Sequence, residues 1–455
     1  MTTFHQVRFA GGRSGDAPLT WGQQCIWDEA KTFAPHHEHF NLSAMIDVPG
    51  GADLADALTA LRKLVEQRES LRTIYPLDLS GYPRQCVRSS GGTLDVVERV
   101  AGEDETRSEA VALTAELQRS PFSLDEIPIR AGIITSDARP RHLILVIFHL
   151  ATDRWDLRNI KRELKQLLAA PLQRSTIPKR VQTLDQAASE QGPEGKAIAE
   201  RSLRYWKSQL VAAPPDMFPG RASDPDSLRF QETCVESPVL ETAIRELSRH
   251  LKVSPTVIFL AVASILLGKL SGKSEVFFLL GCHNRFSDND KMVAGPFSQD
   301  TPMVVDLTDA DFQQVVRRIW YASLTAYVVA KWDPTRVAAA VEEATRERGS
   351  KVDLSCNVNV TLGRDSGLSV SASRADAEYI ENLRPQTRII SMPGSSRDRA
   401  GRRFFLRAHN SSHAIVVSLR TDTSVVSSEE GVNFLEGVVE MAVQEWLRIS
   451  REVVS

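Results

Sequence analysis

The residues with the clearest capacity for chemistry are His149 and Asp153, which follow an uninterrupted apolar run. Residues 143–148 read Leu-Ile-Leu-Val-Ile-Phe, and such a run predicts a buried strand. Imidazole is the side chain best suited to proton transfer near neutral pH, and a strand end would hold it rigidly. A carboxylate four residues later could orient the imidazole or brace its loop. A purely structural pair of histidine and aspartate explains this segment alone equally well.

No other segment of the sequence predicts a metal, a cofactor or a nucleophile. His36, His37 and His39 form the only histidine cluster, but no carboxylate-rich motif follows them, which disfavours a metal site. The five cysteines are scattered and form no CxxC pair, so the sequence predicts neither disulfides nor zinc, and the cytoplasm is the expected compartment. The sequence contains no phosphate-binding glycine loop, dinucleotide fingerprint or GxSxG elbow. We therefore expect no bound cofactor.

The composition indicates a globular chain of two or three domain-sized units. It has 455 residues, of which 42% are hydrophobic and 25% charged, so a large core can be buried. A net charge of -3 and a pI near 6.4 argue against a general nucleic-acid binder. Residues 1–20 lack the apolar core of a secretory signal, and the most apolar helix, 256–270, is too short to span a bilayer. We therefore expect no membrane partner and interpret 256–270 as a core helix.

The elements that must position His149 alternate between strand and helix. The pattern predicts a strand at 41–48 and helices at 52–68 and 156–169, the last with Asp156 as its N-cap. A polar stretch with several prolines, 171–194, is the best candidate for a domain boundary. Beyond it we expect helices at 197–210, 256–270 and 429–449, and strands at 275–281, 353–361, 403–409 and 414–420. Two mixed halves of similar size indicate two lobes that meet at a cleft, a favoured place for ligands.

Seven segments of the chain are similar, in the same order, to the motifs of one family. Residues 148–154 match a His-His-x-x-x-Asp-Gly motif, and residues 18–24, Pro-Leu-Thr-Trp-Gly-Gln-Gln, match an opening P-L-S-x-x-Q motif. The other matching segments are 66–73, 205–215, 281–285, 295–303 and 357–363. On these motifs the chain resembles the condensation domains of nonribosomal peptide synthetases and their free-standing relatives, over nearly its whole length.

The resemblance implies an α/β fold of two chloramphenicol-acetyltransferase-like lobes, arranged as a V-shaped pseudodimer around a central tunnel. The lobes would comprise residues 1–175, which carry the HxxxD motif, and 176–455. The implied activity is that of a free-standing, monomeric condensation enzyme of natural-product biosynthesis. It would transfer an acyl or aminoacyl group from an acyl or peptidyl carrier protein, where phosphopantetheine holds the thioester, to a small-molecule amine or, less favoured, a hydroxyl.

The same resemblance assigns roles to individual residues. His149 would be catalytic, accepting a proton from the amine or positioning it. Asp153 would pair with Arg285 and brace the His149 loop without touching substrate. The residues expected to contact substrate or to gate the site are Arg154, Trp155, His283, Ser298 and Gln299.

The chain departs from the family pattern at three places. Phe148 replaces the first histidine of the motif, and Arg154 replaces its glycine. Arg154 could turn outward, bind a carboxylate or phosphate of an unusual substrate, or close the tunnel. Residues 298–300 replace an asparagine-containing stretch, where Gln299 could act as the amide donor or be a plain turn residue. These departures keep two alternatives open: a catalytically silent domain that recruits a carrier protein or partner enzyme, and a cyclase that acts on a carrier-bound chain.

The segment 384–407 is strongly basic, with seven arginines and a single acidic residue, Asp398. Such a segment could be a docking surface for an acidic carrier protein or for a phosphate of its prosthetic arm. A solvated, mobile loop explains the composition as well, and proline and glycine within 391–401 favour it.

Overall fold

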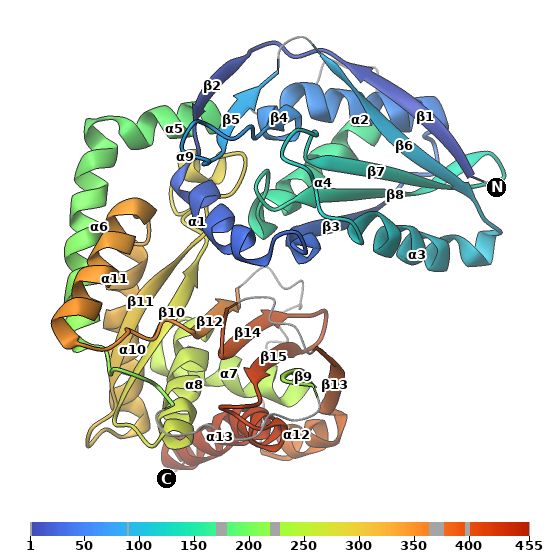
Figure 1. Cartoon of the computed structure of the whole chain (residues 1–455). Coiled ribbons are helices and arrows are strands. Elements are labelled where there is room, and N and C mark those ends of the chain that lie inside the picture. Colours follow the sequence, from blue (N-terminus) through green and yellow to red (C-terminus); the bar gives the residue numbers. More distant parts are fainter. Residues whose placement is uncertain are drawn as a thin grey trace. The chain divides into compact units, whose positions relative to one another are not determined.

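The computed structural model describes residues 2–88, 91–169, 180–218, 228–363, 377–395 and 401–454 (Figure 1). The chain forms two compact units. Unit 1 comprises Met1–Ala199 together with His283–Gln299, and unit 2 comprises Glu200–Cys282 and Asp300–Ser455. The predicted boundary between residues 175 and 176 lies outside the described residues. The inclusion of His283–Gln299 in unit 1 was not predicted, and it decides the composition of the candidate site.

The core of unit 1 is a five-stranded sheet of order β1-β6-β7-β8-β3. Only β6 and β7 pair in parallel, and the other neighbours are antiparallel. The strands are β1 (Thr2–Phe9), β3 (Asn41–Asp47), β6 (Gly92–Val100), β7 (Ile129–Ser136) and β8 (Arg139–Phe148). β8 contains the apolar run predicted from the sequence, and the structure confirms it as a fully buried strand.

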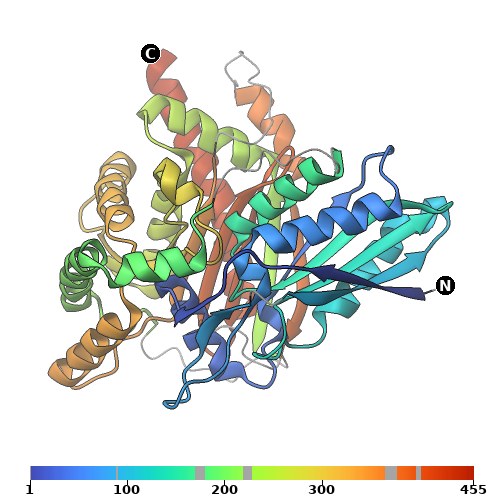
Figure 2. The ribbon, with the colours of Figure 1, turned by 90° about the horizontal axis from the view of Figure 1, so that it is seen from above.

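Helices cover both faces of this sheet. On one face lie α2 (Leu54–Gln67) and α4 (Arg154–Ala169), which pack side by side and appear blue and green in Figure 2. On the other face lies α3 (Thr106–Gln118). Successive side chains of a strand point to opposite faces, so Leu145 joins the core under α2 and α4 while Val146 joins the core under α3. Coverage of both faces explains why β8 is apolar without alternation.

The remaining elements of unit 1 are helices and one small sheet. They are α1 (Trp21–Ala30), α5 (Thr183–Gln191), the short α9 (Asp288–Lys291), the first residues of α6 (Pro193–Ala212), and a small sheet of β2 (Gly15–Pro18), β5 (Arg84–Val87) and β4 (Thr73–Ile74). Single 3-10 turns lie at Lys31–Phe33, Glu38–Phe40, Glu69–Arg72 and Glu103–Glu105. Within the candidate boundary stretch 171–194, residues 183–191 form α5, with Asp185 in its capping box.

Helix α4 begins two residues earlier than predicted. Its first residue is Arg154, and the Asp153 carboxylate accepts a hydrogen bond from the backbone N–H of Asp156 at 2.8 Å. Asp153 is therefore the N-cap, and the prediction of Asp156 as the cap is wrong. Asp156 instead lies on the buried side of the first turn, fully inaccessible to solvent. Sequence alone offered two aspartates three residues apart, and the hydrogen bond from the Asp156 N–H identifies Asp153 as the cap.

Unit 2 is built on a seven-stranded sheet of order β11-β10-β12-β14-β15-β9-β13. Its strands are β9 (Phe230–Ser237), β10 (Glu275–Cys282), β11 (Gln299–Asp306), β12 (Cys356–Thr361), β13 (Arg388–Ser395), β14 (Phe404–Asn410) and β15 (Ile415–Asp422). Its helices are α7 (Pro238–Leu251), α8 (Pro255–Ser271), α10 (Phe312–Val328), α11 (Pro334–Arg348), α12 (Ala377–Leu383) and α13 (Ser428–Val454), with a 3-10 turn at Arg384–Gln386. The large apolar cluster of this unit joins α7, α8 and α13 to the sheet. The predicted core helix is α8, whose interior residues are buried in that cluster.

Much of the arginine-rich segment is ordered structure, so the expectation of a mobile loop is wrong for the part that the structure describes. Residues Arg388–Ser395 form β13, an edge strand paired with β9, and Phe404–Asn410 form β14. Arg403 forms ion pairs with Asp216 and Asp353, and Arg407 pairs with Glu232. Arg397 and Arg399 lie outside the described residues. The arginines of this segment are therefore largely paired with acids from distant segments, and the local sequence does not show those partners.

Within the described residues, no single helix is long and apolar enough to cross a membrane. Helices α7 and α8 satisfy the length and composition criteria together, but they are bent by 109° relative to each other. The five cysteines are all free thiols, and Cys282 and Cys356 are buried.

Candidate active site

His149 lies immediately after the last residue of β8, in a tight turn that leads into α4. Its backbone N–H donates to the Phe40 carbonyl at 2.9 Å, and its carbonyl accepts from the Thr152 N–H at 3.3 Å. The ring is partly buried, and Nδ1 is inaccessible to solvent without a well-aligned partner among the described residues. Burial lowers the pKa of His149 below its ordinary value of 6.5, and the positive charge of Arg154 lowers it further, while Asp153 opposes both. The imidazole is therefore neutral near pH 7 and able to accept a proton.

Asp153 is the most heavily hydrogen-bonded side chain of the site. One carboxylate oxygen, Oδ2, accepts from Arg285 Nη1 at 2.7 Å, from the N–H groups of Phe297 and Ser298 at 3.0 and 3.1 Å, and from the Ser298 hydroxyl at 2.9 Å. Burial alone would raise the pKa of Asp153, but the Arg285 charge and the backbone donors lower it to about 2. The carboxylate is thus a fixed anion with all its acceptor sites turned toward the protein.

Arg285 reaches Asp153 from the segment His283–Gln299. The guanidinium is buried, and Nη2 donates to the Gly295 carbonyl at 2.8 Å while Nη1 also contacts the carbonyl of His283. Asn284 adopts a left-handed conformation with φ of 57° and donates to the Phe297 carbonyl at 3.0 Å. Asparagine tolerates this conformation better than most residues, which explains the Asn-Arg pair of the motif. The ion pair of Asp153 with Arg285, implied by the family resemblance, is present.

Helix α1 supports the same loop from the other direction. The Gln23 side chain closes a capping box with Thr20 and donates to the Leu150 carbonyl at 3.3 Å, where the Tyr75 hydroxyl also donates at 3.1 Å. Gln23 and Tyr75 are both buried. At Gly22 a side chain would meet the Pro296 carbonyl, because a Cβ there would lie 2.4 Å from that oxygen. The opening motif of the sequence thus serves to hold the turn that follows β8.

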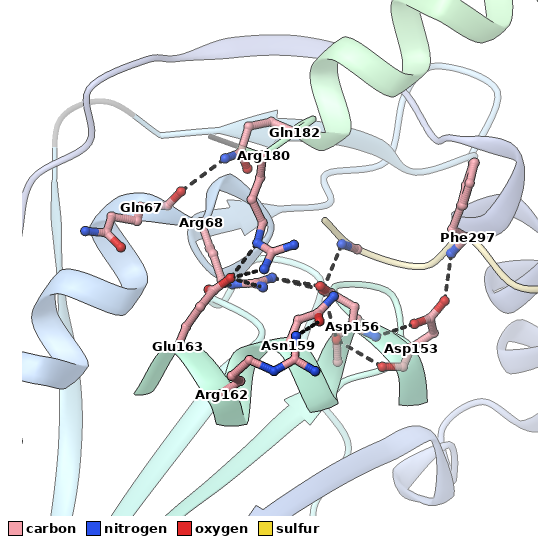
Figure 3. Close-up of polar contacts among 12 residues, drawn as sticks. Gln67, Arg68, Asp153, Asp156, Asn159, Arg162, Glu163, Arg180, Gln182 and Phe297 are labelled. Atoms are coloured by element: carbon pink, nitrogen blue, oxygen red, sulfur yellow. Dashed lines mark hydrogen bonds and ion pairs between the residues drawn. The ribbon is translucent and has the colours of Figure 1, made fainter. Parts of the chain in front are cut away.

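A second buried ion network lies one helical turn beyond Asp153 (Figure 3). Arg68 donates to both oxygens of Asp156 at 3.0 Å and to both oxygens of Glu163, and Arg180 reaches Glu163 from another segment. Burial alone would lower the pKa of Arg68, but the charges of Asp156 and Glu163 raise it. Asp156 Oδ2 also accepts from the Gly295 N–H at 2.9 Å, so both networks are hydrogen-bonded to the loop that carries Arg285. Gly295 has φ of 87°, a conformation that favours glycine.

The residues predicted to contact substrate surround the beginning of α4. The Trp155 and His283 rings are stacked with centroids 4.7 Å apart, and the Arg158 guanidinium lies 4.9 Å from the Trp155 ring. His283 Nδ1 accepts from the Arg285 N–H at 2.9 Å, which fixes that nitrogen as the unprotonated one, and burial lowers the pKa of His283. Arg154 is exposed.

Two further predicted contacts are engaged with the protein itself. The Ser298 hydroxyl is directed at Asp153, and the buried Gln299 amide lies 3.5 Å from the Cys25 sulfur. The structure joins Asp153, Arg285, Ser298 and His283 in one hydrogen-bonded network in unit 1, and His149 lies in the turn that precedes Asp153. Substrate contact by any of them stays a prediction.

Sequence reasoning did not assign roles to Gln23, Tyr75, Arg68 and Glu163. Gln23 and Arg68 lie inside motifs that were recognised, but their partners come from 88 to 127 positions away. The signal available in the sequence for Glu163 was its position on the apolar side of α4, where a carboxylate needs a partner. No group of three or more His, Cys, Asp and Glu side chains in the described part of the chain is arranged to hold a metal ion.

Comparison with known families gives a consistent result. The model of the Condensation domain family matches residues 13–365. The chain is 24% identical over 331 residues to malpibaldin synthetase of Mortierella alpina, a match of 71% of this chain and 6% of that protein. It is 26% identical over 341 residues to the isonitrile lipopeptide synthase of Mycobacterium tuberculosis, a match of 70% and 13%. The chain therefore spans only a small part of these curated relatives.

Solved structures share the fold at low sequence identity. The SgcC5 protein from Streptomyces globisporus matches with a TM-score of 0.70 and 20% identity, over 95% of this chain and 99% of that one. A condensation domain of chain release from the enacyloxin polyketide synthase matches with a TM-score of 0.74 and 17% identity, over 95% and 82%. The X-domain solved with OxyB from teicoplanin biosynthesis matches with a TM-score of 0.67 and 18% identity, over 96% and 95%. The predicted α/β fold of this superfamily is thus confirmed, while the V-shaped arrangement and the tunnel stay predictions.

Proposed function

The chain belongs to the condensation-domain family, and from that premise we propose that it transfers an acyl or aminoacyl group from a carrier-protein thioester to an amine, forming an amide. The observation that carries this proposal is the state of His149: a neutral imidazole at a strand end, in a turn that α1, α4 and the segment His283–Gln299 hold in place. A cytoplasmic site of action and a small soluble amine acceptor are parts of the same proposal.

The chemistry requires one proton acceptor and a fixed geometry. The amine nitrogen attacks the thioester carbonyl carbon, and the nitrogen loses a proton to His149 as the C–N bond forms. Collapse of the tetrahedral intermediate then breaks the C–S bond, and the proton passes to the departing phosphopantetheine thiolate. General-base assistance of this kind is worth about 10²–10⁴-fold in rate. Binding both substrates in line also raises the rate, because their translational and rotational entropy is lost on binding and not in the transition state.

Asp153 acts indirectly in this scheme. Both of its oxygens are engaged, by Arg285, the Ser298 hydroxyl and the backbone N–H groups of Asp156, Phe297 and Ser298, so it is not placed to contact a substrate. Its charge still opposes the loss of basicity that burial imposes on His149. His149 is thus the residue proposed to transfer the proton, and Asp153 is the residue that holds the turn in position.

The test is a transfer assay with matched variants. Purified protein is offered a set of acyl and aminoacyl carrier-protein thioesters with candidate amines, and products are followed by mass spectrometry. Turnover should be lost in His149→Ala and retained in His36→Ala, which removes an exposed histidine of the same unit. Phe148 is buried and stacked on Phe122, so Phe148→Leu is the variant that tests its aromatic ring without a large cavity. Unchanged turnover in His149→Ala would refute the assignment.

A second function is favoured by a specific observation, the two replacements in the motif itself. Phe148 stands where the family has a histidine, and the exposed Arg154 stands where it has glycine. A catalytically silent domain that recruits a carrier protein or a partner enzyme would tolerate both. The same assay separates the two functions: tight carrier binding without turnover across the whole substrate set supports recruitment, and turnover that depends on His149 supports catalysis.

A further inference from the structure

The outward side of α4 carries a row of cations and no acid. Arg154, Arg158, Arg162 and Lys165 follow one another at helical spacing and are all exposed, and Lys161 lies beside them, partly exposed. Over the eleven positions from Arg154 to Lys165 the helix rises about 16 Å, so the row covers about three turns.

Both acids of the same helix are turned inward and neutralised. Asp156 and Glu163 are buried and form ion pairs with Arg68, as Figure 3 shows. The cations of the row therefore have no acidic neighbour within α4 to offset their charge. Lys165 and Lys161 have no side-chain partner among the described residues, and Arg162 has only a long contact of 3.4 Å to Asn159. Because the acids of α4 point inward and its cations point outward, positive potential is concentrated on the outward side of this helix.

The row starts at the catalytic turn. Arg154 is the first residue of α4, five positions after His149, and Arg158 lies against the Trp155 ring that stacks on His283. A negatively charged helix laid along Arg158, Arg162 and Lys165 would place its end beside this turn. The chemistry that fits is an acidic protein surface together with a phosphate, since both are recognised by exposed arginine and lysine.

We propose that the outward side of α4, from Arg158 to Lys165, is the docking surface for the acidic carrier protein that delivers the thioester. This inference rests on the proposed function and names the partner's contact surface, a role that the sequence had suggested for the segment 384–407. The cations of that segment that the structure describes are largely paired with acids, whereas those of α4 face outward.

The experiment compares two donors that carry the same acyl group. One is bound to a phosphopantetheinylated carrier protein, and the other is the acyl N-acetylcysteamine thioester, which has no protein and no phosphate. The double variant Arg162→Glu with Lys165→Glu reverses two charges of the row at a distance from the catalytic turn. Its control is Arg8→Glu with Lys196→Glu, which makes the same change of net charge at exposed cations on β1 and α6.

The α4 variant should raise KM for the carrier-bound donor by about tenfold or more, with a steep dependence on ionic strength. It should leave kcat/KM for the N-acetylcysteamine thioester within about twofold of the unaltered protein, as the control should for both donors. An equal loss with both donors, or equal KM in the two double variants, would overturn the docking surface while leaving the proposed function intact.

Direct binding separates the inference from the proposed function. Fluorescence anisotropy with a panel of phosphopantetheinylated acyl and peptidyl carrier proteins needs no turnover. If neither donor reacts with the unaltered protein, the proposed function fails, but the α4 variant should still weaken carrier binding. If no carrier of the panel binds the unaltered protein more tightly than the α4 variant, the inference fails.

Discussion

Replacing Asp153 by asparagine should destabilise the protein strongly while changing almost nothing in size. The carboxylate accepts four hydrogen bonds at Oδ2 and caps α4 with Oδ1. An amide has only one acceptor oxygen. If that oxygen takes the place of Oδ2, the NH2 group faces the Asp156 N–H, and in the opposite orientation it faces all four donors. Either way two donors are brought together, and the buried Arg285 loses its counter-charge.

The expected loss can be estimated from the pKa of Asp153. The native pKa is about 2, against an ordinary value of 3.8. This difference corresponds to about 2 kcal/mol of stability at pH 7, and it already includes the N-cap bond to the Asp156 N–H, which is one cause of the lowered pKa. The free energy of unfolding should therefore fall by about 2 kcal/mol or more, and the loss of the counter-charge of the buried Arg285 moves the expected value toward the range of about 3–5 kcal/mol known for broken buried ion pairs.

The measurement is equilibrium unfolding in urea, followed by circular dichroism at pH 7 and at successively lower pH. The folded-state pKa lies below the unfolded-state value, so the contribution of Asp153 is complete above about pH 5 and is lost as the pH falls from about 4 toward 2. The difference between variant and unaltered protein should narrow over that interval. The control is Asp47→Asn, because the Asp47 side chain is 73% exposed and its pair with His142 should contribute little.

Two outcomes would refute the role of Asp153 as a structural support of the His149 turn. A destabilisation below about 1 kcal/mol at pH 7 would mean that the five hydrogen bonds and the ion pair are not formed in solution. A variant with unaltered stability and no turnover would instead give Asp153 a direct chemical role. A structural role requires stability and activity to decline together. Because the Asp153 charge raises the pKa of His149, the acid limb of any remaining turnover should also move to lower pH in the variant.

Three further predictions concern the same turn. The acid limb of the pH profile of kcat/KM should lie below pH 6.5, because burial lowers the pKa of His149, and Arg154→Gly should move that limb upward by removing a positive charge. Gly22→Ala should lower Tm and cost about 1–3 kcal/mol in urea unfolding, because the added methyl meets a backbone carbonyl, whereas Gly12→Ala, with open space around it, should not. Arg68→Lys should cost about 3 kcal/mol or more, since one ammonium cannot serve two buried carboxylates in a bidentate manner.

The sequence was most informative where one local pattern decided the structure. The run 143–148 could only be a buried strand or a buried helical segment, and its length and the turn that follows favoured the strand that became β8. Helices α2, α8 and α13 were also placed within a few residues by their apolar spacing. The prediction was wrong where the role of a charged segment was judged only from its neighbours in the sequence. The arginines of 384–407 suggested a solvated loop, but Arg403 and Arg407 find acids 50 to 187 positions away and hold strands together.

The site was predictable in its residue types and less so in its connections. His149, Asp153 and Arg285 could be named through the family resemblance, but nothing in the order of residues shows that Ser298 turns its hydroxyl onto Asp153. The second network was missed because Arg68 and Glu163 are ordinary surface residue types. Only the packing of α2 against α4 makes them buried partners. Long-range ion pairs of this kind carry no local periodicity.

The position of Arg154 is unfavourable for a positive charge within its own helix. It is the first residue of α4, where the helix dipole is positive and an arginine is disfavoured by about 0.3–1 kcal/mol. Asp153 at the cap offsets part of that penalty, yet glycine or serine would avoid it altogether. The charge is exposed and still lowers the pKa of His149 five residues away. An arginine here therefore has two effects at once: its charge adds to the effect of burial in lowering the pKa of His149, and it heads the basic row of α4.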